Sequence, residues 1–449
     1  MSKDIHIKKG LSIPLQGESI KSSSNFKRPT KFAVQPTDFY GLTPKLSVKV
    51  GDSVSVGDVL FFDKNQEQIK FTSPVSGKIV AVNRGAKRKI LSVEISASDK
   101  DKFKNFGKVD ITSLSQEKIK DLMLKSGCWP YLKQRPYDVI ANPNDVPKAI
   151  FISAYNTAPL GADYSYILKD KKDAFKTGIA ALAKLTSGKV NLGIGSKDAD
   201  FFSDINQADI YQVSGKHPAG NASFQIAKIN PINQGERVWV VNPQDVAIIG
   251  NLFLTGQYKP NRMVALAGTG VAKPQYYNLT SGQNLTQLFK EKLNQGNYRI
   301  ISGDVLTGQK IDSNSFLSFY TNLISVIPEG NHYDFLGWHP FVGNNKLSLS
   351  RTFFSWLTPN KKYNLDTNLN GEERALVVTG EMEKVFPMDI YPMQLIKAAM
   401  VEDIEKMENL GIYEVAPEDF ALIDFTNTSK LEAQSIIRHA LDVMIKEVG

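Results

Sequence analysis

The sequence predicts a multidomain protein of the α/β and α+β classes, and three observations support this. The chain has 449 residues, enough for about three domains at roughly 150 residues each. Hydrophobic residues make up 42% and charged residues 22%, as in ordinary globular proteins. Along the chain, the hydrophobic pattern changes from short alternating runs to strands between helices, and finally to helices alone.

Residues 1–104 are expected to form the first domain, an N-terminal segment followed by a small β-barrel. Its apolar runs alternate with polar residues between Gly-Asp and Pro-containing turns, a pattern typical of antiparallel strands. The stretches from Val50 to Leu60 and from Ser73 to Ile79 resemble the biotinyl/lipoyl domain family, which implies a barrel-sandwich. Six side chains are expected in its core: Val48, Val59, Leu60, Val75, Ile79 and Val82.

Lys64 lies near the hairpin position at which carrier members of that family are acylated. The surrounding residues, Asp63-Lys64-Asn65-Gln66-Glu67, lack the usual Met-Lys or Asp-Lys-Ala setting. We therefore expect Lys64 to be an unmodified surface lysine.

Residues 105–260 alternate helices with strands, which predicts a Rossmann-like α/β layer domain. Apolar residues recur at helical spacing from Leu114 to Ser126 and through most of the stretch from Tyr164 to Leu185. Short buried strands are expected at Ala149–Ala154, Val190–Ile194 and Val238–Val241.

Residues 261–375 begin with the apolar strand Arg262–Ala267. Further strands, punctuated by Gly and Asn, surround a helix expected at Thr286–Leu293, which predicts an α+β unit of the β-grasp, SLBB-like type. Residues 376–449 are expected to form a helical domain. Its main helices are predicted at Met393–Leu410 and Leu431–Val448.

Charge is distributed unevenly along the chain. The first 108 residues hold 20 basic and 10 acidic residues, whereas residues 371–424 hold four basic and thirteen acidic ones. A basic end suits anionic lipid or an acidic protein, and no nucleic-acid-binding motif accompanies the lysines. Four cations follow a predicted strand at a turn and form a candidate docking surface: Arg84, Lys87, Arg88 and Lys89. A solvated turn without a partner is the alternative.

Cys128 is the single cysteine, so the chain cannot form an internal disulfide, a CxxC pair or a cysteine-ligated iron–sulfur cluster. The N-terminus shows no apolar secretory segment. The longest apolar stretch, Val238 to Leu254, is interrupted by polar residues before it reaches the ~18 residues that a membrane span needs. We expect a protein without transmembrane helices.

Two short glycine motifs follow predicted strands, at Gly193-Ile194-Gly195 and Gly268-Thr269-Gly270. Neither completes a dinucleotide fingerprint, and the sequence has no GxxxxGK[ST] loop. The nearby pair His332 and His339, with Asp334, lacks a clear set of metal ligands. We therefore expect no metal and no cofactor in this chain.

The stretch from Gly127 to Tyr137 concentrates aromatic, Gly, Pro and Arg residues at the end of a predicted helix. Such a mixture can line a pocket for a flat ligand, with Trp129, Tyr131 and Arg135 as the candidate residues. It can equally form a packed loop between domains.

The whole chain resembles the family of the NqrA subunits of the Na⁺-translocating NADH:quinone reductase. Five blocks carry the resemblance: Ser76–Arg88, Gly127–Trp129 with Arg135-Pro136, His217–Gly220, Ser325–Gly330 and Phe386–Pro392. That family looks like a relative of the flavin-binding subunit of complex I and of the C-type subunit of the Rnf complex. Here the glycines of the flavin loop are largely replaced, and residues 424–430 contain no cluster cysteines.

The resemblance implies a cofactor-free, peripheral subunit in a complex of six different subunits, on the cytoplasmic face of the bacterial inner membrane. Such a complex oxidises NADH, reduces quinone to quinol and exports Na⁺, with flavins and iron–sulfur centres on its other subunits. This chain is expected to contact the membrane surface and to support the quinone-reducing membrane subunit. Two alternatives remain open: an Rnf-type electron-transfer subunit, or a free-standing lipoyl-like carrier component.

Overall fold

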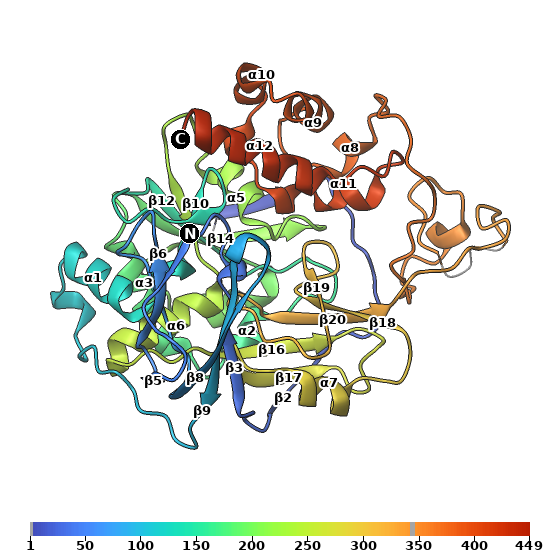
Figure 1. The fold of residues 1–449 in the computed structure, drawn as a ribbon. Helices are drawn as coiled ribbons and strands as arrows, with labels where there is room; N and C mark the ends of the chain where they lie inside the picture. Colours follow the sequence, from blue (N-terminus) through green and yellow to red (C-terminus); the bar gives the residue numbers. More distant parts are fainter. Residues whose placement is uncertain (1–2, 342–345) are drawn as a thin grey trace.

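Four β-sheets and a set of C-terminal helices build the computed structural model, which describes residues 3–341 and 346–449. Two small sheets form the N-terminal barrel, and two larger sheets form the middle of the chain. In Figure 1 the C-terminal helices lie together along one side of the molecule, above the sheets.

The N-terminal barrel consists of a four-stranded sheet, β3-β9-β8-β5, and a three-stranded sheet, β4-β6-β7. All neighbouring strands in the two sheets are antiparallel, as expected from the alternating pattern. The strands are β3 (Lys31–Val34), β4 (Pro44–Leu46), β5 (Ser53–Val54), β6 (Val59–Asp63), β7 (Lys70–Thr72), β8 (Gly77–Arg84) and β9 (Ile90–Ala97).

The two Gly-Asp turns of the barrel share one local geometry. Gly51 and Gly57 have φ values of 99° and 92°, in the left-handed region that glycine adopts without a Cβ penalty. The carboxylates of Asp52 and Asp58 each accept a hydrogen bond from the backbone N–H three residues earlier, at 2.9 and 2.8 Å. These contacts explain why Gly-Asp pairs separate the strands.

Of the six side chains expected in the barrel core, three are fully buried and three are partly buried; two of the latter, Val48 and Val82, still pack against that core. Fully buried are Leu60, Val75 and Ile79. Only partly buried are Val48, Val59 and Val82. The strand register shifts between Val59 and Phe61 and again between Ile79 and Ala81, which breaks the regular inward–outward alternation that the prediction assumed. Val48 lies beyond the end of β4.

The second sheet has seven strands in the order β1-β14-β13-β12-β15-β10-β11. The five strands from β1 to β15 run parallel, and β10 and β11 add an antiparallel edge. The strands are β1 (Lys3–Ile7), β10 (Lys133–Arg135), β11 (Val139–Ile140), β12 (Ala149–Ser153), β13 (Lys189–Ile194), β14 (Asp209–Gly215) and β15 (Val238–Val240). Both β14 and the participation of β1 are absent from the sequence prediction.

Helices accompany this sheet, and two of them approach unusually closely. The longer helices are α1 (Gln116–Ser126), α3 (Lys172–Ala183), α5 (Ala222–Ile229) and α6 (Pro243–Thr255), and the short α2 spans Tyr164–Leu168. A Cβ on Gly250 of α6 would lie 1.7 Å from the carbonyl oxygen of Ala174 in α3. Glycine is therefore required where α3 crosses α6.

The third sheet has six strands in the order β19-β18-β20-β16-β17-β2 and carries helix α7 (Thr286–Lys292). Its strands are β2 (Ile20–Asn25), β16 (Asn261–Ala267), β17 (Gln275–Thr280), β18 (Tyr298–Ser302), β19 (Gln309–Ile311) and β20 (Leu323–Pro328). The edge strand β2 pairs with β17, so the first 25 residues contribute strands to two sheets outside the barrel.

The C-terminal helices are α8 (Glu381–Val385), α9 (Pro392–Met400), α10 (Ile404–Asn409), α11 (Ala421–Thr426) and α12 (Ala433–Glu447). The single helix predicted at Met393–Leu410 is wrong, because the chain breaks between α9 and α10. Glu402 has a positive φ of 54°, and the Asp403 carboxylate then caps the new helix by accepting from the Lys406 N–H at 3.1 Å. The helices share a core with Ile7 of β1 and Met263 of β16.

Between β20 and α8 the chain forms a long irregular segment that projects from the body, shown in orange at the right of Figure 1. We call residues 331–341 and 346–363 the arm. The part of the arm that the structure describes contains one short 3-10 helix, η6 (Phe354–Leu357).

Candidate functional site

The predicted docking cations lie at the tip of the hairpin between β8 and β9. We call Arg84, Lys87, Arg88 and Lys89 the basic tip; all four are exposed. The Gly85 N–H donates to the Lys89 carbonyl at 2.8 Å and closes the turn, and Arg84 Nη1 donates to the Arg88 carbonyl at 3.1 Å. Among the described residues no acidic side chain pairs with the tip, which leaves four positive charges available to an anionic partner.

Trp129 and Tyr131 are buried in the core rather than placed around an open pocket. Trp129 is 0% exposed; its Nε1 donates to the Ala141 carbonyl at 2.7 Å, and its ring meets that of Trp239 edge-to-face. Tyr131 stacks on Phe319 with ring centroids 4.4 Å apart. Rings from the regions of the second and third sheets therefore fill the space next to these two candidates.

Arg135, the third candidate, belongs to a buried ionic cluster. Its guanidinium lies 3.0 Å from Asp138 and donates to Glu418 at 2.9 Å, which connects β10 to the C-terminal helical region. Burial raises the pKa of the Asp138 carboxyl, but the combined positive charges of Arg135, Lys133 and Arg438 outweigh it and lower the pKa to about 2. Burial raises the pKa of the neighbouring Asp419. The cluster joins two parts of the fold, and its positive charge comes from Arg135 together with Lys133, whose ammonium lies 3.8 Å from Asp138.

A second buried ion pair was not found from the sequence. Arg262 at the start of β16 donates to Asp245 of α6 at 2.6 Å, and both side chains are almost completely buried. Arg262 also donates to the Thr321 carbonyl at 3.1 Å and to Asn322 at 2.6 Å. The sequence does contain a signal for this ion pair: Asp245 lies within a largely apolar helix, and Arg262 lies near the start of an apolar strand. Charged residues are seldom buried unless they are paired, so two such charges in apolar elements indicate a buried pair.

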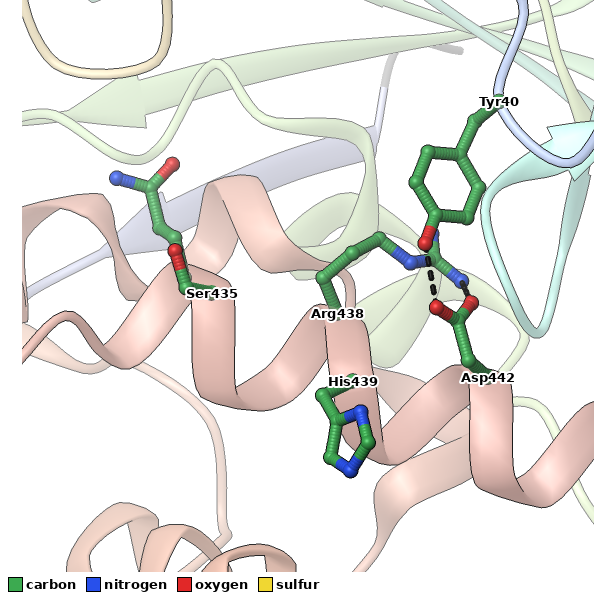
Figure 2. A pocket seen from close by; sticks show the side chains of 6 residues that line it. Tyr40, Ser435, Arg438, His439 and Asp442 are labelled. Atoms are coloured by element: carbon green, nitrogen blue, oxygen red, sulfur yellow. Dashed lines mark hydrogen bonds and ion pairs between the residues drawn. The ribbon is translucent and has the colours of Figure 1, made fainter. Parts of the chain in front are cut away.

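A surface hollow of about 370 Å³ lies between α12 and the loop that carries Tyr40. Its lining consists of Tyr40, Gln434, Ser435, Arg438, His439 and Asp442. Figure 2 shows the Arg438 guanidinium beside the Tyr40 ring, 4.1 Å from its centre, and Asp442 accepting hydrogen bonds from both residues. The charged groups of this hollow thus neutralise each other. The sequence does not reveal this hollow, because Tyr40 lies far along the chain from the five lining residues on α12.

The two glycine motifs are explained by close packing. A Cβ on Gly193 would lie 2.1 Å from Gln225 Oε1, and one on Gly268 would lie 2.1 Å from the Val326 carbonyl oxygen. Cys128 is fully buried, and burial raises the pKa of its thiol to about 12, so it stays protonated at neutral pH. Lys64 is on the surface, as expected.

Family comparisons agree with this architecture. Residues 5–98 match the NqrA N-terminal barrel-sandwich hybrid domain, residues 114–258 the NqrA second alpha/beta domain, and residues 263–313 the NqrA C-terminal domain of SLBB type. The A subunit of the Na(+)-translocating NADH-quinone reductase from Hahella chejuensis is 38% identical over 447 residues, covering 99% of this chain and 100% of the relative. The chain belongs to the NqrA family.

A second NqrA relative, from Haemophilus influenzae strain Rd, is 36% identical with the same coverage of 99% and 100%. The predicted resemblance is thereby confirmed, as is the coarse fold: a barrel-sandwich, an α/β domain, an SLBB domain and a helical C-terminal stretch. Among solved structures, a chain of an NAD+-reducing NiFe hydrogenase aligns with a TM-score of 0.39 at 10% identity, covering 75% of this chain and 64% of that chain. That likeness is too loose to support an assignment.

Within the described residues, no helix is long and apolar enough to cross a membrane. The apolar stretch from Val238 to Leu254 is instead divided between β15 and α6.

Proposed function

We propose that this chain is a cofactor-free peripheral subunit of a Na⁺-pumping NADH:quinone oxidoreductase, the complex that reduces quinone to quinol and exports Na⁺. It acts at the cytoplasmic face of the bacterial inner membrane, where it supports the quinone-reducing membrane subunit. The flavins and iron–sulfur centres that carry electrons from NADH lie on other subunits. The main support is similarity to relatives named as the A subunit of that enzyme over practically their entire length.

Three structural observations support the absence of a cofactor in this chain. Neighbouring protein atoms fill the space around the glycines of the two motifs, where a phosphate would have to approach. The thiol of Cys128 is buried and protonated. Trp129 and Tyr131 pack against other rings, so a quinone could enter between them and Arg135 only if these side chains moved. A quinone pocket at these three residues stays a prediction.

The finer description of the fold belongs to the same proposal. A Rossmann-like second domain is supported by the parallel order β14-β13-β12-β15, and a β-grasp third domain by the sheet that carries α7. Domain boundaries after residues 104, 260 and 375 stay predictions.

The basic tip is the observation that carries the peripheral attachment. Four exposed cations without acidic partners in the described chain suit anionic headgroups or an acidic surface of a neighbouring subunit. Exposed charges are screened over ~8 Å at physiological ionic strength, so attachment through the tip should weaken as salt is added.

The experiment reverses the tip charge with Lys87→Glu, Arg88→Glu and Lys89→Glu, and measures how much of this chain is recovered with the complex across a salt series. We expect markedly lower recovery, with a chain that is still folded by circular dichroism. The control reverses three other exposed lysines of the same domain, Lys64, Lys78 and Lys100, and so changes the net charge equally. Equal recovery of both variants at every salt concentration would refute docking through the tip.

A further inference from the structure

The arm exposes a concentration of aromatic side chains that no other part of the described chain covers. Their exposed fractions range from 44% to 103%, and the residues are Tyr333, Phe335, Trp338, Phe341, Phe354 and Trp356. Single exposed apolar residues are common, but a contiguous group of large ones marks an interaction site. The arm also contains two of the four tryptophans of the chain.

Several aromatic rings of the arm lie next to one another: Trp338, His339, Phe341 and Phe354 form a continuous row of ring contacts. Phe341 and Phe354, from the two halves of the arm, have ring centroids 6.0 Å apart, and the His339 ring lies 5.4 Å from Phe341. Arg351 lies over the Trp356 ring at 5.6 Å. The Phe341–Phe354 contact joins the two halves of the arm, as does the ion pair of Lys346 with Asp334 at 2.6 Å.

The base of the arm is fixed to the body of the protein. The Gly330 N–H donates to Thr367 Oγ1 at 2.8 Å, and Tyr363 exchanges backbone hydrogen bonds with Pro14 and Gln16 at 2.8 and 2.9 Å. An aromatic surface on a fixed base is presented at a defined position relative to the rest of the chain.

We propose that the arm is a docking element that inserts its aromatic rings into an apolar, acid-rimmed face of another protein subunit of the same complex. This inference rests on the proposed function, because it requires a multisubunit assembly. Trp, Tyr, Phe and Arg are the residues that dominate binding energy at protein interfaces. The arm supplies these types together: Trp338, Trp356, Tyr333, Phe341 and Arg351.

The backbone of the arm favours a protein over lipid as its partner. Apart from turns and η6, the described arm residues belong to no helix or strand. Irregular backbone is not tolerated against lipid hydrocarbon, because its N–H and C=O groups find no partners there, whereas a protein partner can pair them. The segment 331–363 holds four basic residues and one acidic residue, which predicts acidic groups around the apolar face of the partner.

The arm and the basic tip should respond differently to salt. Attachment through the tip is electrostatic and weakens with ionic strength, whereas burial of aromatic surface persists, and sulfate salts strengthen it. The two surfaces can therefore be tested separately in one complex.

The direct test places a benzophenone-bearing phenylalanine analogue at Phe341 of this chain and irradiates the purified complex. We expect a cross-linked product with the mass of this chain plus another subunit. The matched control carries the analogue at Val146, an exposed apolar position outside the arm. A lipid adduct, or no intermolecular product from Phe341 in an intact complex, would overturn the proposal.

A second measurement uses the double variant Trp338→Ser with Phe341→Ser, against Val146→Ser. Both arm side chains are exposed, so the free chain should unfold at an unchanged temperature. We expect recovery with the complex at high salt to fall at least fivefold for the arm variant and to stay unchanged for the control. If the arm variant is recovered with the complex as well as the wild type is, the arm proposal is refuted and the proposed function stands. If the wild type itself is not recovered with the complex, the proposed function is refuted.

Discussion

The four tryptophans of the chain divide into two pairs with opposite environments. Trp129 and Trp239 meet in the core with ring centroids 5.4 Å apart and are at most 1% exposed, whereas Trp338 and Trp356 are 68% and 50% exposed on the arm. Both regions are rich in aromatic residues. Local composition therefore does not decide burial; what decides it is whether the rest of the chain supplies contacting surfaces.

The core pair receives such surfaces from distant parts of the chain. Next to Tyr131 lie Phe319, which precedes β20 of the third sheet, and Tyr258, whose hydroxyl is 3.1 Å from that of Tyr131. In the described arm, Leu347 packs against the core of the body, whereas the ring contacts of Trp338, Phe341, Phe354 and Trp356 are all with other arm residues. The contrast is the basis for the proposal that another subunit covers the arm.

The largest expected effect separates the two pairs of tryptophans. Trp129→Ala should lower the free energy of unfolding by about 3–5 kcal/mol, because it removes a large buried ring and leaves a cavity. Trp338→Ala should change it by less than about 0.5 kcal/mol, since an exposed ring loses few contacts. Urea titrations of the free chain measure both values. Similar losses for the two variants would remove the distinction between core and arm.

A smaller effect is expected in the barrel, where neighbouring residues of β8 face opposite sides. Ile79 is 1% exposed and Val80 is 44% exposed. Ile79→Ala should destabilise by about 2–5 kcal/mol and Val80→Ala by less than about 0.5 kcal/mol, again measured by urea titration. A loss below about half a kcal/mol for Ile79→Ala would contradict the placement of this side chain inside the barrel.

The smallest expected effect depends on pH and compares a carboxylate of the packed region with one of the arm. Asp38 accepts from the Phe319 N–H at 2.8 Å, and burial raises the pKa of its carboxyl to about 6. Between pH ~4 and ~6 the unfolded chain has released this proton and the folded chain retains it. Asp38 ionisation therefore lowers stability as pH rises through this window, by about 1–3 kcal/mol.

Asp38→Asn should remove that decrease, as seen in the difference between wild-type and variant unfolding free energies from pH ~4 to ~7. Asp334 of the arm serves as the comparison, because its hydrogen bond with Lys346 lowers its pKa instead. Asp334→Asn should leave the decrease in place. A wild-type minus Asp38→Asn difference that does not vary with pH would contradict the burial of this carboxyl.

The sequence predicted elements whose signals are local, and missed features that arise from long-range pairing. The barrel strands, the strand at Val190–Ile194 and the helix at Leu114–Ser126 were recognisable from periodicity and turns. The placement of β1 next to β14 was not, because this parallel pair joins segments that lie far apart in the chain, such as Lys3 with Tyr211. The basic tip could be located as a charged turn, since such a turn lies at the surface.

The candidate pocket residues also show that local sequence does not reveal long-range packing. Its aromatic and charged residues were identified, but their environment depends on Trp239, Phe319 and Glu418, which arrive from three other parts of the chain. The exposed arm could not be distinguished from that buried segment by composition, because both are aromatic-rich. The hydrophobic periodicity of the sequence does not show which irregular segment is buried by the rest of the chain and which stays exposed.

Hydrogen exchange of this chain, free and within the purified complex, tests the central claim most directly. Backbone amides of residues 333–341 and 346–357 should exchange rapidly in the free chain and at least about tenfold more slowly in the complex, because a partner covers them. Amides around Trp129 should be protected equally in both states. Arm amides that exchange at the same rate in the free chain and in the intact complex would contradict the account.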